Sequence, residues 1–429
     1  MFESSKVIFQ TYPAMPATDA KPDSGRMGAA AMRKLNSALL LDLIRSKGPV
    51  SRADLSRLSG LTKPTVSSQV ADLLRRGLVV EAGEGEPDER GGKPSRLIKF
   101  DPGCGFVVGV EIGSAKVRVR LAEMDGGILD REDVRIRPER GAEYILETLA
   151  ETCRTVLGRG RGRKRKLLAM AIAAPGRVDV RSGTVLEAGN LFHWKNVAVG
   201  EFLQRAFRVP VQVENDVNLA TLGEMHYGIC RGGVKNFVLI RLTTGVGAGL
   251  VIDGHLFQGN HWAAGEIGHM VFGREGVRGE VKERGYLEST VGSDRLLERV
   301  RLARANKSVK AALSNGVEPS GDSETLSLND PAAAEIVEDL ASHLGLTAAH
   351  LAAVLDPELI VLNGELFDLV TDQIREVVER IIPWPVRIER SALGEEGALL
   401  GAIGSARVLA HELICNADPP MGRVHEKEG

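Results

Sequence analysis

Cysteine is scarce in this chain of 429 residues, and its few cysteines are far apart. The four are Cys104, Cys153, Cys230 and Cys415, and no two of them form a C-x-x-C pair. This spacing is typical of reduced structural thiols and argues against a disulfide framework or a cysteine zinc site. We therefore expect neither disulfides nor a bound metal.

Long apolar runs are missing as well. The longest fall far short of a membrane span, and the first 25 residues mix charges, prolines and polar side chains where a signal peptide would be apolar. We expect a cytoplasmic protein with no membrane partner and a disordered arm over residues 1–28. The length and a hydrophobic content of 43% predict two or three domains with sizeable cores.

Neither sign of charge dominates the whole chain, whose net charge is −2. Between Met27 and Phe100, however, thirteen Lys and Arg stand against eight Asp and Glu, a net of +5. A local excess of this kind is the electrostatic footprint of DNA binding. A second basic run, residues 159–166, is interpreted as a solvated loop, with non-specific phosphate contact as the alternative.

The basic region contains a helix-turn-helix pattern over residues 50–79. Ser51 is placed to cap a first helix, and Gly60 can end it in a left-handed conformation. Thr62 is placed to cap a second helix, predicted over Lys63–Arg76, in which Pro64 is tolerated because it lies in the first turn.

The second predicted helix carries the candidate DNA contacts. Its apolar positions form one stripe: Val66, Val70, Leu73 and Leu74. Short polar side chains on the outer face suit a helix lying in the major groove. They are Lys63, Thr65, Ser67, Ser68 and Gln69. The alternative is a small helical hairpin with no role in DNA binding.

A wing follows the two helices. Strands are predicted over residues 78–82 and 96–100, so that the unit over residues 29–101 is a winged helix-turn-helix. Arg90 and Lys93 lie in the loop between these strands, in a glycine-containing segment able to enter a minor groove. The alternative for this segment is a solvated hairpin tip.

Beyond Phe100 the pattern changes to alternating strands and helices. Strands are predicted over residues 106–112, 116–124, 128–136, 167–174, 209–213, 237–242 and 359–362, and helices over residues 142–157, 217–227, 367–381 and 398–413. This pattern predicts a mixed α/β fold of two related lobes with a cleft between them, spanning residues 105–413 and followed by a tail over residues 414–429. A helix over residues 32–47, with Leu35, Leu39, Leu40 and Leu43 on one side, is expected to pack under the helix-turn-helix.

The motifs in the two lobes resemble those of the ROK family of repressors, open reading frames and kinases. The motifs are GNLFHW, ENDVN, TTGVGAG, GEIGH and GYLES. The resemblance covers nearly everything from Met32 to Leu413 and implies a two-lobed actin-like ATPase fold. The winged helix marks the repressor branch of that family.

The resemblance implies a sugar site. The matching positions are Asn190, Asn215, Asp216, Glu266, His269 and Glu288. Convergent carboxylates and amides can pair with neighbouring hydroxyls and so offset the desolvation of a sugar. Each has an alternative: Asn215 or Asp216 caps the following helix, Glu266 and His269 form a structural pair, and Asn190 holds a turn.

The phosphate machinery departs from the family pattern. Family kinases carry Asp-x-Gly-Gly-Thr where this chain has Glu-Ile-Gly-Ser-Ala, residues 111–115, and paired glycines where it has Asn363-Gly364. The second phosphate loop, residues 243–249, is intact, and Asp216 would be the general base of a kinase. Zinc-bearing members have cysteines at the positions of Gly279, Val281 and Tyr286, so we expect no zinc here.

The sequence therefore predicts a DNA-binding transcriptional regulator, a repressor of sugar-utilisation genes without a cofactor. Its partners are expected to be a double-stranded DNA operator and a sugar or sugar derivative in the interlobe cleft, and its assembly a homodimer or dimer of dimers. The alternative is an ATP-dependent sugar kinase with an appended DNA-binding domain. A third possibility is a regulator controlled by a protein partner.

Overall fold

The computed structural model describes residues 28–85, 94–159, 165–189, 191–274, 277, 285–293, 295–296, 298–299, 301–302 and 331–416. Several predictions fall outside these residues. They are the disordered arm, Arg90 and Lys93 of the wing tip, most of the basic run at 159–166, the candidate Asn190, and the tail beyond residue 416.

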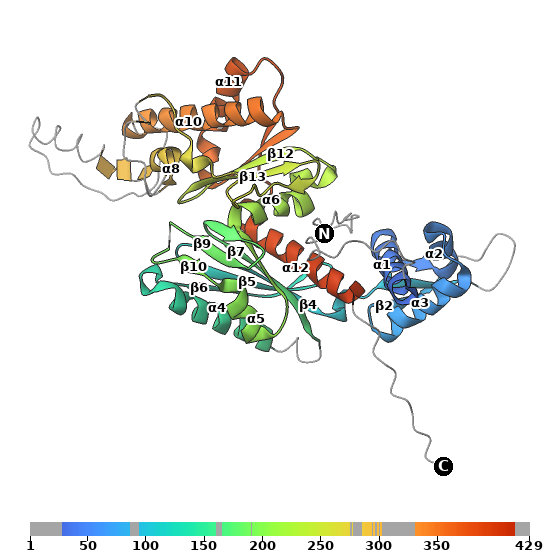
Figure 1. Cartoon of the computed structure of the whole chain (residues 1–429). Coiled ribbons are helices and arrows are strands. Elements are labelled where there is room, and N and C mark those ends of the chain that lie inside the picture. The colour runs from blue at the N-terminus through green and yellow to red at the C-terminus, as the bar shows by residue number, and fades with distance from the viewer. Residues whose placement is uncertain are drawn as a thin grey trace, which may run out of the picture.

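The N-terminal domain is a winged helix, as predicted (Figure 1). Its elements are α1 Ala29–Lys47, β1 Val50–Ser51, α2 Arg52–Ser59, α3 Lys63–Arg75, β2 Val79–Glu84 and β3 Arg96–Phe100. The three strands form an antiparallel sheet in the order β1-β3-β2. Ser51 and Asp54 make a capping box at the start of α2, and Gly60 ends that helix at φ +71.

The packing face of α1 differs from the prediction. Leu35 and Leu39 are 57% and 40% exposed, whereas Leu40, Leu41 and Ile44 are buried. The prediction that Leu35 and Leu39 pack under the helix-turn-helix is therefore wrong. Leucines occur on both faces of this helix, so its sequence pattern alone does not select the buried one.

The first lobe is built on a mixed sheet in the order β11-β7-β4-β5-β6. These strands are β4 Phe106–Ile112, β5 Lys116–Glu123, β6 Ile128–Arg135, β7 Leu167–Ala174 and β11 Val211–Asn215. Helices α4 Gly141–Gly158 and α5 Val199–Phe207 pack on one face through Ile145, Leu149 and Leu203. A small sheet of β8 Arg177–Asp179, β9 Thr184–Glu187 and β10 Lys195–Val197 lies beside it.

The second lobe has a sheet in the order β14-β13-β12-β15-β16. Its strands are β12 Phe237–Leu242, β13 Val246–Ile252, β14 His255–Leu256, β15 Leu359–Asn363 and β16 Ile388–Arg390. The helices on its outer face are α8 Tyr286–Val291, α10 Pro331–Leu355 and α11 Thr371–Ile381. Strand β13 begins at Val246, so only residues 243–245 form a turn within the loop predicted over residues 243–249.

Two helices lie between the sheets, α6 Asp216–Tyr227 and α12 Gly397–Asn416 (Figure 1). They pack backbone against backbone, because a Cβ on Gly401 would lie only 1.7 Å from the carbonyl oxygen of Leu219. One hydrophobic cluster joins both sheets, both helices and the winged helix. The sheets and their covering helices therefore form one continuous stack around α6 and α12.

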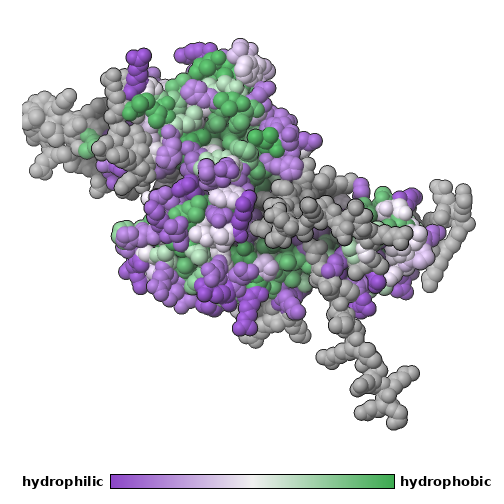
Figure 2. All heavy atoms as spheres, viewed as in Figure 1, coloured by the Kyte–Doolittle hydropathy of each residue, from purple (hydrophilic) through white to green (hydrophobic). Residues whose placement is uncertain are grey.

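Helix α12 is long and apolar enough to match a membrane span by length and composition, within residues 394–415. However, 72% of its most apolar window is buried inside the fold. The surface visible in Figure 2 shows hydrophilic residues over much of the first lobe, with smaller apolar areas between them. We interpret α12 as the core helix of a globular protein.

Candidate functional site

The candidate site begins where β11 ends and α6 starts. The Asn215 side chain caps α6: its Oδ1 accepts from the backbone N–H groups of Val217 and Asn218, at 2.9 and 3.1 Å. Its amide nitrogen donates to the carbonyl of Gly176 at 2.8 Å. The capping interpretation of Asn215 is thus confirmed. The cap also fixes the start of α6 and so the backbone position of Asp216, its first residue.

Asp216 is half-buried at the start of α6. Burial raises the pKa of its carboxyl group, Arg241 opposes this shift, and Glu111 adds to it. Asp216 belongs to α6, whereas Glu111 and Arg241 come from the central strands of the first and second lobes. The carboxylate therefore lies where the two lobes meet.

Glu266 and His269 come from the second lobe, at a short 3-10 helix over Ile267–His269. Glu266 follows Gly265, whose backbone has φ +85. Burial raises the pKa of Glu266, while His269 lowers it and Glu288 and Asp216 raise it further. These electrostatic effects place the four candidate side chains in one neighbourhood.

Glu288 reaches the same neighbourhood from α8. A Cβ on Gly245 would lie 3.0 Å from its carboxylate, so the glycine of the turn leaves room for this side chain. Tyr286, at one of the cysteine positions of zinc-bearing relatives, contacts Phe272 with ring centroids 6.5 Å apart. Among the described residues, no group of three or more His, Cys, Asp and Glu is placed to hold a metal ion.

A buried ion-pair cluster, which sequence reasoning missed, lies beside Asp216. Arg118 Nε donates to Glu111 Oε2 at 2.6 Å, and Arg241 Nη2 donates to Glu111 Oε1 at 3.1 Å. Arg118 Nη1 also donates to Glu396, just before α12, at 2.9 Å. We call Glu111, Arg118, Arg241 and Glu396 the arginine cluster; it joins both lobes and the start of α12.

Three members of the arginine cluster are buried almost completely, with exposures of 6% for Glu111, 4% for Arg118 and 6% for Arg241. Burial alone would lower the pKa of Arg118, but Glu111 and the glutamates before α12 raise it overall. Both arginines interrupt apolar strands, in the segments KVRVRL and FVLIRL. A charge within a buried strand was the available signal for this cluster.

A second hydrogen-bonded contact crosses the lobes at Glu214. Its carboxylate accepts from the side chains of Asn218, at 3.0 Å, and Gln258. Gln258 follows β14 of the second lobe, whereas Glu214 lies in β11 of the first. Burial raises the pKa of Glu214, and these hydrogen bonds oppose that shift.

The predicted DNA face lies on α3 of the winged helix. Lys63, Ser67 and Ser68 are exposed, and Thr65 is half-buried with its hydroxyl 2.9 Å from that of Thr62. Gln69 is only 8% exposed, so the prediction that it lies on the outer face is wrong. Successive helical residues differ by about 100°, which places Gln69 beside Val66 and Leu73 in the apolar stripe.

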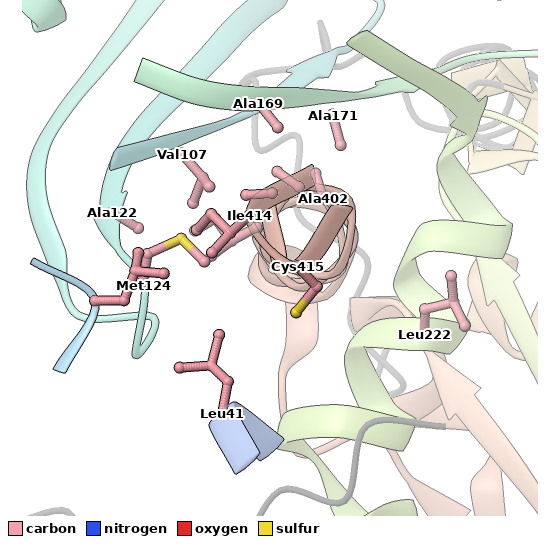
Figure 3. Packing of buried hydrophobic residues seen from close by; sticks show 14 of the residues in the cluster. Leu41, Val107, Ala122, Met124, Ala169, Ala171, Leu222, Ala402, Ile414 and Cys415 are labelled. Atoms are coloured by element: carbon pink, nitrogen blue, oxygen red, sulfur yellow. The ribbon is translucent and has the colours of Figure 1, made fainter. Parts of the chain in front are cut away.

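The C-terminal half of α12 contacts the winged helix. Arg76, at the end of α3, donates to the carbonyl of Ile414, and His411 Nε2 lies 3.3 Å from Asp42 Oδ1 of α1. Figure 3 shows Leu41 of α1 together with Met124, Ile414 and Cys415 in the same buried cluster. Helix α12 thus extends from the arginine cluster to the winged helix.

Comparison with known proteins agrees with this architecture. Residues 107–408 match the ROK family, and residues 34–91 match the MarR family. The chain belongs to the ROK family. The ROK match spans both lobes, whereas the MarR match lies in the winged helix.

Relatives of this ROK protein include regulators and enzymes. The "Xylose repressor" of Bacillus spizizenii is 26% identical over 389 residues, covering 89% of this chain and 97% of the repressor. The "Glucokinase" of Halalkalibacterium halodurans is 31% identical over 266 residues, covering 60% of this chain and 80% of the kinase. The alignment with the repressor thus includes the winged helix in addition to the lobes.

A solved structure has the same fold. It is a ROK family transcriptional regulator described as a homologue of the Escherichia coli MLC protein, with a TM-score of 0.72 and 24% sequence identity. The match covers 90% of this chain and 98% of that one. The predicted fold class, a winged helix joined to a two-lobed actin-like domain, is confirmed.

Proposed function

We propose that this protein is a DNA-binding transcriptional repressor of sugar-utilisation genes, released from its operator by a sugar held between the lobes. The observation that carries the proposal is that the winged helix and the two lobes share one hydrophobic cluster through α12. In addition, Asp216 and Glu288 lie near enough to Glu266 to raise its pKa. The relative named as a xylose repressor matches this chain over most of its own length.

The ligand would be recognised by its hydroxyl groups. Glu266 and Glu288 enter the site from the second lobe, and Asp216 lies at the junction, so a ligand touching all three would favour one closure of the lobes. A shift from 1:99 to 99:1 between two closures needs a differential affinity of about 10⁴-fold, or about 5.5 kcal/mol. His269 and Asn190 are proposed to complete the site.

On the DNA side, Lys63, Thr65, Ser67 and Ser68 would face the major groove, with Arg90 and Lys93 in the wing. A homodimer or dimer of dimers acting in the cytoplasm on a palindromic operator would place two recognition helices one helical turn apart. A lobe closure that changes this separation would weaken the fit to the operator.

A kinase is the second candidate, supported by Asp216 and by the glucokinase relative. Its phosphate chemistry needs a cation near the position of Glu111. That carboxylate is already engaged by two guanidinium groups. We therefore prefer the regulator.

The test is a screen for sugars that stabilise the full chain against thermal unfolding, with and without ATP and Mg²⁺. D-xylose, D-glucose and N-acetylglucosamine are the first probes. A ligand at 100 times its Kd stabilises the folded state by about 2.7 kcal/mol. We expect a stabilising sugar that needs no nucleotide and that releases operator DNA in fluorescence anisotropy.

The Asp216→Asn variant tests whether the sugar response depends on this site. We expect it to bind operator as the wild type does and to lose the sugar response. A variant that responds to sugar normally would show that the sensing site lies elsewhere. Sugar-dependent ATP hydrolysis that is lost in Asp216→Asn would support the kinase, and intact DNA binding without any sugar effect would support control by a protein partner.

A further inference from the structure

The arginine cluster puts a guanidinium group in the place where family kinases need a divalent cation. Both oxygens of Glu111, the residue at the position of the kinase aspartate, accept hydrogen bonds, one from Arg118 and the other from Arg241. Arg241 is also near enough to Asp216 to affect its pKa. The guanidinium of Arg241 therefore lies among the two carboxylates that a metal–nucleotide complex would use.

These residues do not fit a magnesium ion. Mg²⁺ requires near-octahedral oxygen ligands at about 2.0–2.1 Å, and it is commonly held by one or two carboxylates. Here each oxygen of Glu111 already accepts a hydrogen bond from an arginine, and two buried positive charges lie beside the carboxylate. A divalent cation would have to displace an arginine that the fold holds in place.

The remaining hydrogen-bonding groups of Arg241 point to the same conclusion. Its Nε and Nη1 are buried and have no hydrogen-bond partner among the described residues. Groups that carry N–H bonds repel a cation and require an acceptor. These two groups of Arg241 therefore favour an oxygen acceptor and disfavour a metal ion beside them.

We propose that Arg241 is the resident cation of this cleft, a guanidinium that neutralises Glu111 and Asp216 and thereby excludes divalent metal ions. Arg118 supports this role by holding Glu111 from the other side and by linking it to Glu396 before α12. The proposal concerns the same cleft as the proposed function. Its test uses metal alone, so that either proposal can fail without the other.

The test is a titration of the full chain with Mn²⁺. Electron paramagnetic resonance measures the free ion during the titration, and thermal unfolding measures the stability of the protein. We expect no saturable Mn²⁺ site in the wild type. Arg241→Gln removes the charge and leaves two carboxylates facing each other, so we expect this variant to gain one Mn²⁺ site and at least a tenfold higher affinity. Mn²⁺ should also raise its melting temperature.

Two variants serve as controls. Arg241→Lys keeps a positive charge and is expected to bind no Mn²⁺. Glu111→Gln with Arg241→Gln removes the carboxylate as well, and is expected to lose the site gained in Arg241→Gln. Together they separate the effect of charge from a general loosening of the fold.

Three results would overturn the proposal. One is a stoichiometric Mn²⁺ site in the wild type that Glu111→Gln abolishes. Another is a folded Arg241→Gln variant that binds no more Mn²⁺ than the wild type. The last is an Arg241→Gln variant that stays unfolded at every Mn²⁺ concentration, because the metal should replace the lost cation.

Discussion

At the scale of single residues, the position of Glu266 depends on its neighbour Gly265. The backbone there has φ +85, and a Cβ would lie only 1.8 Å from the carbonyl oxygen of Ala248. Any side chain at this position would force the segment away from β13. The absence of a side chain at Gly265 therefore lets Glu266 keep its position beside β13.

We expect Gly265→Ala to destabilise the fold by about 2–4 kcal/mol, since both a left-handed conformation and a backbone clash oppose it. The sugar response should be lost even at temperatures where the variant is folded. Urea unfolding and sugar-induced thermal shifts measure the two effects. Gly189→Ala is the control, because a Cβ there meets nothing within 4 Å. Equal stability of the two variants would contradict this account.

Residue by residue, the candidate carboxylates could be predicted, whereas the contacts that build the arginine cluster could not. Asp216, Glu266 and Glu288 lie in short motifs, and the structure brings them into one electrostatic neighbourhood. The partners of Glu111 are separated from it by 7 and 130 positions in the chain, a pairing that only the folded sheets create. Local motifs reveal a site when its residues follow fixed turns, and they do not reveal contacts between distant strands.

Asn363 is a second residue whose contacts could not be predicted from the sequence. The sequence shows only that it replaces a glycine of the kinase pattern. In the structure its amide donates to the hydroxyl of Ser391 and to the carbonyl of Gly394, both at 2.8 Å. It thereby holds the turn that leads to Glu396. A residue that departs from a family pattern has here gained a structural role.

At the scale of elements, α12 is the physical connection between the arginine cluster and the winged helix. Glu396 precedes its first residue and belongs to the arginine cluster, while the carbonyl of Ile414 near its end accepts from Arg76. We expect this helix to carry a movement of the lobes to the DNA-binding domain. The helix was predicted from its apolar pattern, but its contacts at both ends were not.

We expect Arg76→Ala to reduce the effect of sugar on operator affinity about tenfold, because a hydrogen bond from a charged donor contributes about 1.5–3 kcal/mol. Sugar binding itself should change little. Fluorescence anisotropy with and without sugar measures the coupling. Arg75→Ala is the matched control, since Arg75 is exposed and forms its ion pair with Asp72 of the same helix. A full sugar response in Arg76→Ala would show that the signal takes another route.

His411 makes the same junction sensitive to pH. Burial, with a smaller contribution from Arg45, lowers its pKa from 6.5 to about 4. In the unfolded chain the imidazole takes up a proton below pH 6.5, whereas in the folded chain it does so only near pH 4. The folded state is therefore fully stable above pH 6.5 and loses stability as the pH falls from 6.5 towards 4.

Between pH 7.5 and 5 we expect His411 to account for a loss of about 2 kcal/mol in the free energy of unfolding. Urea unfolding of the wild type and of His411→Gln at both pH values isolates this contribution. His226, which is also shielded from solvent, is present in both the wild type and the variant. The variant should lose less stability than the wild type, and an identical loss would show that His411 is not buried in its neutral form.

At the scale of the whole molecule, charge is divided between the domains. The segment Met27–Phe100 has a net charge of +5 while the whole chain has −2, so the rest of the chain has −7. Several cations of the winged helix are engaged in ion pairs within it, among them Arg57, Arg75 and Arg96. Lys63 is exposed and forms no ion pair with any residue that the structure describes. It lies in the first turn of α3, where a phosphate is expected.

This division of charge predicts how DNA binding responds to salt. Each phosphate neutralised by the protein contributes about −0.9 to the slope of the logarithm of affinity against the logarithm of salt concentration. We expect Lys63→Ala to weaken binding to all DNA sequences alike and to make the slope less steep by about 0.9. Fluorescence anisotropy titrations between about 50 and 200 mM salt measure this slope.

The control for Lys63→Ala is Lys195→Ala, which removes an exposed lysine of β10 in the first lobe and so changes the net charge equally. If repulsion between the acidic lobes and DNA governed binding, both variants would weaken it to the same extent. If α3 lies on the phosphate backbone, only Lys63→Ala changes the slope. An unchanged slope in Lys63→Ala would remove α3 from the DNA interface, and the wing would then have to carry the binding alone.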